Sequence, residues 1–246
     1  MHLVWAALLF FTGATFAQAE PPAPFTVAID VGHSIKKPGA ISARGRGEFY
    51  FNRDIARQLK AALEARGFRA FLINESGADI SLLSRGQTAR SKGADLFISV
   101  HHDAVNQKYY RQWEYDGQTR PYSDAFRGYS VFVSKKNPQA AESRRLGGLL
   151  AASMQAAGFT PTLHHNEPIP GENRPLINRD TGLYEFSDLV VLKTSRMPAV
   201  LLECGVIVHR EEELEMLKPE VQRRIVAATV RAVEQYVAGE KAAGVE

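Results

Sequence analysis

The chain has 246 residues, of which 45% are hydrophobic and 23% are charged, and its formal net charge at pH 7 is +3. This length and composition are typical of one globular domain with a sizeable core, and they exclude a disordered, fibrous or membrane protein. Cys204 is the only cysteine, which excludes an intrachain disulfide. The small basic clusters are accompanied by no nucleic-acid-binding motif, so no nucleic-acid partner is expected.

The first residues have the pattern of an export signal. An apolar run, LVWAALLFF, is followed by small residues, and Ala17-Gln18-Ala19 has the small-x-small form of a cleavage site. An uncleaved anchor is the alternative, but the run is short for spanning a bilayer. We therefore expect an exported protein, periplasmic or extracellular, without membrane contact after cleavage. The expected organisation is a signal peptide over 1–19, a Pro-rich joint over 20–24, one domain over 25–240 and a disordered tail over 241–246.

In the first half of the domain, strand-like segments alternate with helix-like segments. Apolar, partly β-branched runs predict strands at 25–30, 68–73 and 96–100. Between the first two strands an apolar residue recurs every four positions, which predicts a helix that begins near Glu48 and stops at Gly67. A second helix is expected over about 80–92. This order implies right-handed crossovers, so the predicted fold is α/β, with a mostly parallel twisted sheet and helices on both faces.

The second half contains further strands, three helices and two long connections. Strands are predicted at 129–134, 188–192 and 199–203, and helices from Pro138 to about Ala157, over 211–217, and from Pro219 onward. The connection over 105–127 carries six aromatic residues, and a second one covers 159–187. Loops of this length are usually functional. For 105–127 two roles stay open, a sugar-stacking lid over the site or a small satellite core under the loop.

Residues suited to metal chemistry follow separate predicted strands. His33 follows the first strand, His101 follows the third, and Glu203 ends the strand over 199–203. Glu48 leaves the loop after the first strand and can reach the same edge. In a parallel sheet, ligands bind beyond the carboxyl ends of the strands. Two histidines and one carboxylate leave a fourth position for water, as in catalytic zinc sites, and a further carboxylate can act as general base and then acid.

At these residues the chain resembles the zinc-dependent N-acetylmuramoyl-L-alanine amidases, which cut peptidoglycan between muramic acid and the stem peptide. The matching segments are AIDVGHSIKKPGA, GEFYFNRDIARQLKAALEARGF, SLLSRGQTARSKGADLFISVHHDA, GYSVFVSKKNP and MPAVLLECGVIVHREEE. The resemblance implies a zinc amidase catalytic domain over 25–240, Zn²⁺ bound by His33, Glu48 and His101, and Glu203 as the catalytic carboxylate. It also implies peptidoglycan as the substrate.

The sequence departs from this family at three places. Val31 stands where a proline is usual before the Gly-His pair, and His209 stands where an asparagine is common. The first change affects the stiffness of the loop, and the second leaves the capping of the following segment open. The connection over 105–127 is longer than usual, so the resemblance says nothing about its role.

Several polar residues near the expected site have competing roles. His102 is expected to point away from His101, because adjacent residues on a strand face opposite sides. Asp30 either orients His33 or caps the turn that follows it. His164 and His165 are expected to be surface residues, with substrate contact as the alternative, and Cys204 is expected to be buried. Further expectations are packing and hydrogen bonding for Arg85, and contact of Arg174 or Arg179 with a peptide carboxylate.

Two other functions compete with the amidase. One is a non-catalytic peptidoglycan-binding or regulatory protein that keeps the fold, and the other is a different zinc hydrolase, such as a carboxypeptidase or a deacetylase. The presence of all four residues, His33, Glu48, His101 and Glu203, argues against the first. The sequence does not identify an activator protein, and we expect a monomer.

Overall fold

The computed structural model describes residues 24–243, so the expected signal peptide lies outside the described residues. A seven-stranded sheet runs through the centre in the order β2-β1-β3-β9-β6-β8-β7. Pairing is parallel for β1–β2, β1–β3, β3–β9 and β6–β8, and antiparallel for β6–β9 and β7–β8. The predicted mostly parallel sheet is confirmed. Its strands are β1 (Thr26–Val31), β2 (Arg69–Ile73), β3 (Leu96–Asp103), β6 (Ser130–Val133), β7 (Leu176–Asn178), β8 (Leu183–Glu185) and β9 (Ala199–Val206).

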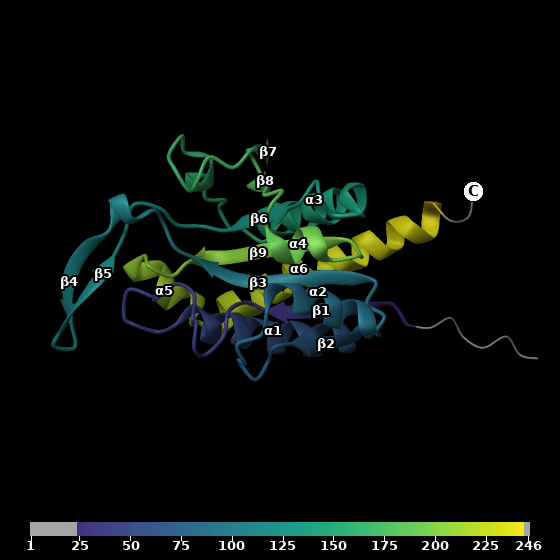
Figure 1. Cartoon of the computed structure of the whole chain (residues 1–246), viewed down its shortest axis with the longest axis horizontal. Helices are drawn as coiled ribbons and strands as arrows, with labels where there is room; N and C mark the ends of the chain where they lie inside the picture. The colour runs from purple at the N-terminus through teal and green to yellow at the C-terminus, as the bar shows by residue number, and fades with distance from the viewer. Residues whose placement is uncertain (1–23, 244–246) are drawn as a thin grey trace, which may run out of the picture.

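Helices cover both faces of the sheet, as predicted (Figure 1). The larger core lies between one face and the helices α1 (Glu48–Glu64), α3 (Ala140–Ala156) and α6 (Pro219–Ala243). The smaller core lies between the other face and the helices α2 (Leu82–Ser91) and α4 (Val190–Thr194). Helix α5 (Arg210–Met216) follows β9, and α6 continues past the expected start of the tail at residue 241. In the described part of the chain, no helix combines the length and the apolar character needed to cross a membrane.

Three of the predicted segments are different in the structure. Most of the strand predicted at 188–192 lies in helix α4, because a short apolar run does not distinguish a strand from a buried helix. Helix α3 begins at Ala140 instead of Pro138, and the Asn137 side chain donates to the carbonyls of Leu192, Ser195 and Met197. The connection over 159–187 is not one loop, since it contains the 3₁₀ turn η2 (His164–Asn166) and the strands β7 and β8.

The aromatic connection over 105–127 is also structured. After the 3₁₀ turn η1 (Gln107–Tyr109), the strands β4 (Arg111–Tyr115) and β5 (Gln118–Tyr122) form an antiparallel hairpin that projects away from the sheet (Figure 1). Its turn residues, Asp116 and Gly117, both have positive φ, as a two-residue Asp-Gly hairpin turn requires. At its base, Val105 forms a small separate core with Val206 and Val208. A satellite core therefore does exist under this connection.

A buried ion pair holds the loop that follows β1. Arg85 of α2 donates from Nη1 to Asp30 Oδ1 at 2.7 Å, and Ser99 donates to Asp30 Oδ2 at 2.8 Å. Arg85 also donates to the carbonyl oxygens of Val31 at 2.6 Å and His33 at 2.7 Å. Asp30 thus neither orients the His33 ring nor caps the turn, because it faces α2 and β3. The packing and hydrogen-bonding role expected for Arg85 is confirmed.

Glu212 joins the end of β9 to the segment just before β6. Its carboxylate accepts from the backbone N–H of Val206 at 3.0 Å and from that of Gly128 at 2.8 Å. Burial raises the pKa of Glu212 to about 7, although these two hydrogen bonds oppose the shift. A carboxyl whose pKa is higher in the folded state stabilises that state at low pH, and the stabilisation is lost as the pH rises through the folded pKa.

We expect Arg85→Met to lower the free energy of unfolding by about 3–5 kcal/mol, because it leaves the Asp30 carboxylate buried without its cation. Urea denaturation followed by circular dichroism measures the change. The matched control is Arg90→Met on the exposed side of the same helix, which should change stability by less than about 0.5 kcal/mol. Equal effects of the two substitutions would contradict the structural role of this ion pair.

We expect Glu212→Gln to flatten the pH dependence of stability. Between pH 5 and pH 8 the wild type should lose about 2 kcal/mol more than this variant, because its raised pKa lies inside that interval. Denaturation curves at pH 5, 6.5 and 8 provide the test, with the exposed neighbour Glu211→Gln as the control that keeps the wild-type slope. Parallel slopes for wild type and Glu212→Gln would refute the assignment.

Candidate metal and catalytic site

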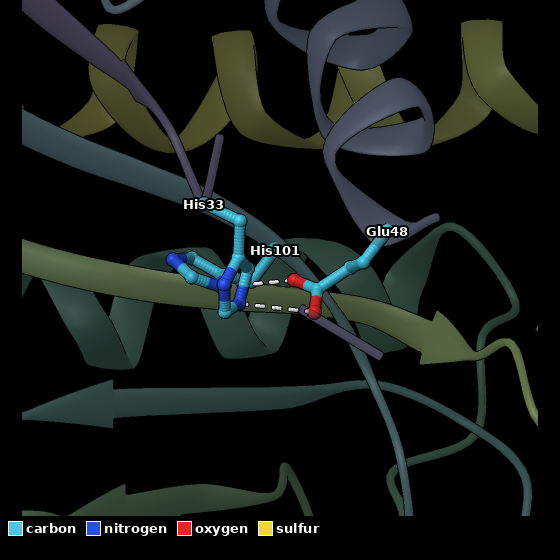
Figure 2. A group of neighbouring side chains, drawn as sticks. All are labelled: His33, Glu48 and His101. Carbon is cyan, nitrogen blue, oxygen red and sulfur yellow. Dashed lines mark hydrogen bonds and ion pairs between the residues drawn. The ribbon is translucent and has the colours of Figure 1, made fainter. Parts of the chain in front are cut away.

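Three side chains from distant parts of the chain meet at the carboxyl ends of β1 and β3. The carboxylate of Glu48, the first residue of α1, faces the rings of His33 and His101, which lie against each other (Figure 2). His33 Nε2 is 3.0 Å from Glu48 Oε2, and His101 Nδ1 is 2.9 Å from Glu48 Oε1. All three candidate ligand atoms lie within 4.8 Å of one another. Two imidazole nitrogens and one carboxylate oxygen are a donor set that zinc prefers, so these residues fit a metal ion.

The backbone is shaped to bring His33 to this position. His33 has a φ of +67°, which is uncommon for a residue other than glycine. Its carbonyl oxygen accepts from Arg85 at 2.7 Å and from the Asn74 side chain at 2.8 Å, and these contacts hold the turn. Gly39 allows the close approach, because a Cβ there would lie 2.2 Å from Glu48 Oε2. A Cβ on Gly32 would lie 2.4 Å from His101 Nε2.

Glu48 is buried and ionised. Besides the two histidines, its carboxylate accepts from the backbone N–H of Ala40 at 2.9 Å and of His102 at 3.1 Å, and from Asn52 Nδ2 at 3.0 Å. Burial favours the neutral acid, but the hydrogen bonds from His101 and His33 and their charges outweigh it, so the pKa of Glu48 lies well below its ordinary value. The position at the N-terminus of α1 also favours a negative charge.

Glu203 faces the same site from the neighbouring strand. It is paired with His101 across β3 and β9, and paired residues point to the same face of a sheet. Its Oε2 atom is buried and has no hydrogen-bond partner among the described residues. Burial and the negative charges of Asp103 and Glu48 raise the pKa of Glu203 well above its ordinary value. Glu203 is therefore a cavity-lining carboxyl group that no described hydrogen-bond donor holds in the ionised form.

A cavity of about 490 Å³ opens over these groups. His33, His101 and Glu203 line it on one side, and Arg174 lies on its wall. Apolar side chains complete the wall, namely Leu82, Val105, Phe132, Phe186, Leu189, Val191 and Leu201. A concave, largely apolar surface with a few converging polar groups is typical of a small-molecule or catalytic site.

His164 and His165 are not surface residues, which corrects the expectation from the sequence. The His164 side chain is 1% exposed, and His165 lines the cavity together with Asp103 and Glu172. His165 Nε2 is 2.7 Å from Asp103 Oδ2, and His165 Nδ1 is 3.0 Å from Glu172 Oε2. The loop brings these residues together over a long sequence separation. In the sequence, only the adjacent pair of histidines indicated that this segment could contribute to a site.

The other residues near the site follow the expectations more closely. His102 is buried and pairs with Asn52 at 2.9 Å, away from His101, and Cys204 is buried in the larger core. His209 caps α5, because its Nδ1 accepts from the backbone N–H groups of Glu211 and Glu212. The Arg174 guanidinium lies on the Phe186 ring at 3.7 Å. Arg179 is exposed and is not part of the cavity wall.

Known proteins are similar in sequence to most of this chain. Residues 27–235 match the profile of the Amidase_3 family, described as N-acetylmuramoyl-L-alanine amidase. The probable N-acetylmuramoyl-L-alanine amidase AmiB of Haemophilus influenzae is 30% identical over 240 residues, which cover 89% of this chain and 53% of that protein. AmiA of Salmonella typhimurium is 27% identical, with 85% of this chain and 75% of that protein covered. The chain thus spans about half the length of some curated relatives, 53% of AmiB and 52% of AmiC from Neisseria meningitidis.

Solved structures share the fold. The N-acetylmuramoyl-L-alanine amidase from Clostridium difficile 630 superposes with a TM-score of 0.67 at 22% identity, covering 87% of this chain and 97% of that one. The catalytic domain of CwlV from Paenibacillus polymyxa gives a TM-score of 0.66 at 21% identity, covering 87% and 98%. These likenesses establish the α/β architecture, and the profile match covers more than half of the sequence. The chain therefore belongs to the Amidase_3 family of N-acetylmuramoyl-L-alanine amidases.

Proposed function

We propose that this protein hydrolyses the amide bond between N-acetylmuramic acid and L-alanine in peptidoglycan. The observation that carries the proposal is the Glu203 carboxyl, whose Oε2 has no described partner and which lines the same cavity as His33 and His101, where these two histidines converge with Glu48. Membership in the amidase family supports the substrate. The expected signal peptide over 1–19 would bring the chain to the cell wall outside the cytoplasmic membrane.

His33, Glu48 and His101 would bind a zinc ion. Their two nitrogens and one oxygen leave a fourth position for water. Among the described residues, only these two histidines supply positive charge to the Glu48 carboxylate. When bound, zinc would lower the pKa of that water toward neutrality and polarise the amide carbonyl. The buried hydrogen bonds from Asn52 and from the backbone of Ala40 and His102 would keep the carboxylate fixed for this purpose.

Glu203 would carry the proton in both halves of the reaction. As a carboxylate it would accept a proton from the attacking water, and as a carboxylic acid it would donate that proton to the departing alanine nitrogen. Its position on β9 is rigid, because the strand is paired on both sides, to β3 and to β6. Among the described residues, the other two carboxylates that line the cavity, Asp103 and Glu172, both pair with His165.

The cavity walls suit a substrate with a polar backbone and apolar side groups. Phe132, Leu201 and Val191 would contact the apolar parts of the bound segment, and the Arg174 guanidinium, held on Phe186, would bind a carboxylate of the stem peptide. Contact of Arg174 with a free carboxylate also suits a carboxypeptidase. The reaction products separate the two reactions, because the amidase releases a free alanine amino terminus and leaves the lactyl group of muramic acid intact.

Glu203→Gln should lower the rate of stem-peptide release by about 10²–10⁴-fold, because the amide does not take up and return the proton. Mass spectrometry of products from purified peptidoglycan measures the release and identifies the bond that is cut. The metal content of the variant should match that of the wild type. Glu211→Gln on the exposed surface is the control that keeps full activity. Undiminished release by Glu203→Gln would show that another residue carries the proton.

His33→Ala should lose one equivalent of bound Zn²⁺ and all measurable amide cleavage, because it removes one of three protein ligands. Metal analysis of the dialysed protein gives the stoichiometry, and circular dichroism verifies that the variant is folded. His209→Gln, a histidine of the α5 cap, serves as the control with an unchanged metal content. A folded His33→Ala protein with the wild-type metal content would disprove the ligand assignment.

A further inference from the structure

A second group of metal-type ligands lies in the wall of the same cavity. Asp103 ends β3, and His164 and His165 form the start of η2. The Nε2 atoms of the two histidines both approach Asp103 Oδ2, at 3.4 Å from His164 and 2.7 Å from His165. The three candidate ligand atoms lie within 4.8 Å of one another, as they do in the group of His33, Glu48 and His101. None of the three belongs to that first group.

The outward nitrogens of both rings are already engaged. His164 Nδ1 is 2.8 Å from the hydroxyl oxygen of Thr162, and His165 Nδ1 is 3.0 Å from Glu172 Oε2. Histidines that bind metals nearly always engage the second ring nitrogen in a hydrogen bond, commonly to a carboxylate as His165 does with Glu172, and the Thr162 hydroxyl occupies the corresponding position on His164. These contacts fix each ring so that Nε2 is the nitrogen presented to Asp103.

An ion pair without a metal does not explain both histidines. His165 alone can pair with Asp103 and Glu172, and these two carboxylates raise the pKa of its ring to about 9 against the effect of burial. The His164 side chain is 1% exposed, and its Nε2 atom, 3.4 Å from Asp103 Oδ2, makes no side-chain hydrogen bond of ordinary geometry to a described residue. Burial lowers the pKa of His164, so its ring is neutral and offers a lone pair. A buried polar atom without a partner is destabilising unless something binds it.

The rings are held by aromatic neighbours. The His165 ring packs edge-on against Phe132 and Tyr184, with ring centroids 4.9 Å and 5.7 Å apart. The His164 ring packs on Phe126, with centroids 5.3 Å apart. Tyr184 also donates to the carbonyl of Thr162 at 2.9 Å, which fixes the segment just before η2. The ligand atoms are therefore preorganised by an apolar shell, as a metal site requires.

We propose that Asp103, His164 and His165 form a second binding site for a divalent metal ion, distinct from the site of His33, Glu48 and His101. Two imidazole nitrogens and one carboxylate oxygen favour a borderline-soft ion, and Zn²⁺ is the first choice. The ion would tie the connection over 159–187 to the end of β3.

The second site would also change the charge of the cavity. Asp103, His165 and Glu172 all line it, and Glu203 lies in the same wall. A divalent ion there would add positive charge to the cavity wall that Glu203 also lines.

Metal stoichiometry tests this proposal without reference to catalysis. The full chain, with any affinity tag removed, is stripped with a chelator, titrated with Zn²⁺, dialysed and analysed for bound zinc. We expect two equivalents for the wild type, one for His165→Gln, one for His33→Ala and none for the double variant. Glu172→Gln removes only the partner of His165 and should weaken the second equivalent by about 10–100-fold. His209→Gln is the control and should keep two.

Thermal unfolding provides a second reading for variants that bind less metal. Binding of an ion to the folded state raises the melting temperature. Zn²⁺ at the site of Asp103, His164 and His165 should therefore raise the melting temperature of His33→Ala but not that of the double variant. A wild type that holds one equivalent, with that equivalent retained in His165→Gln and lost in His33→Ala, would overturn the second site. The same result would leave the first site and the proposed amidase reaction intact.

Discussion

The carboxylate of Glu48 is buried at the first residue of α1, where it can be ionised only because five donors surround it. Two of them are the rings of His33 and His101, and the others are the Asn52 side chain and the backbone N–H groups of Ala40 and His102. These donors come from the loop after β1, from β3 and from α1 itself. Burial of this one charge therefore requires the three segments to meet, and the candidate metal site is the place where they do.

The register between β3 and β9 then decides which side chains join Glu48. His101 is paired with Glu203, so both point toward the cavity, and their neighbours His102 and Cys204 point toward α1 and the larger core. A shift of one residue would bury Glu203 and expose Cys204. After His101 the pairing is irregular, and Asp103 lies opposite Val206. This irregularity ends the regular sheet at the cavity, where Asp103 meets the connection over 159–187.

The parts of the site that follow from local pattern and sheet topology were predictable. His33 follows β1 and His101 lies near the end of β3, so neighbouring parallel strands bring them to one edge of the sheet, and Glu48 is the first residue of an amphipathic helix. The contacts of His164 and His165 were not predictable, because they depend on Tyr184 and Thr162 and on Asp103, which lies about sixty positions away in the sequence. The adjacent Asp116 and Gly117 are typical of a two-residue hairpin turn, but the connection over 105–127 was expected to be a loop, either a lid or a cover over a satellite core.

Three carboxylates approach the centre of the site, and their surroundings give them different roles. Glu48 has its five donors, and Asp103 has His165, whose charge and hydrogen bond keep the pKa of Asp103 low despite burial. The Oε2 atom of Glu203 has no hydrogen-bond partner among the described residues, and burial together with the charges of the other two raises the pKa of Glu203. A group that changes its protonation during a reaction must not be committed to one state by its neighbours. Among the three, only Glu203 meets that condition, because the structure fixes the charge of the other two.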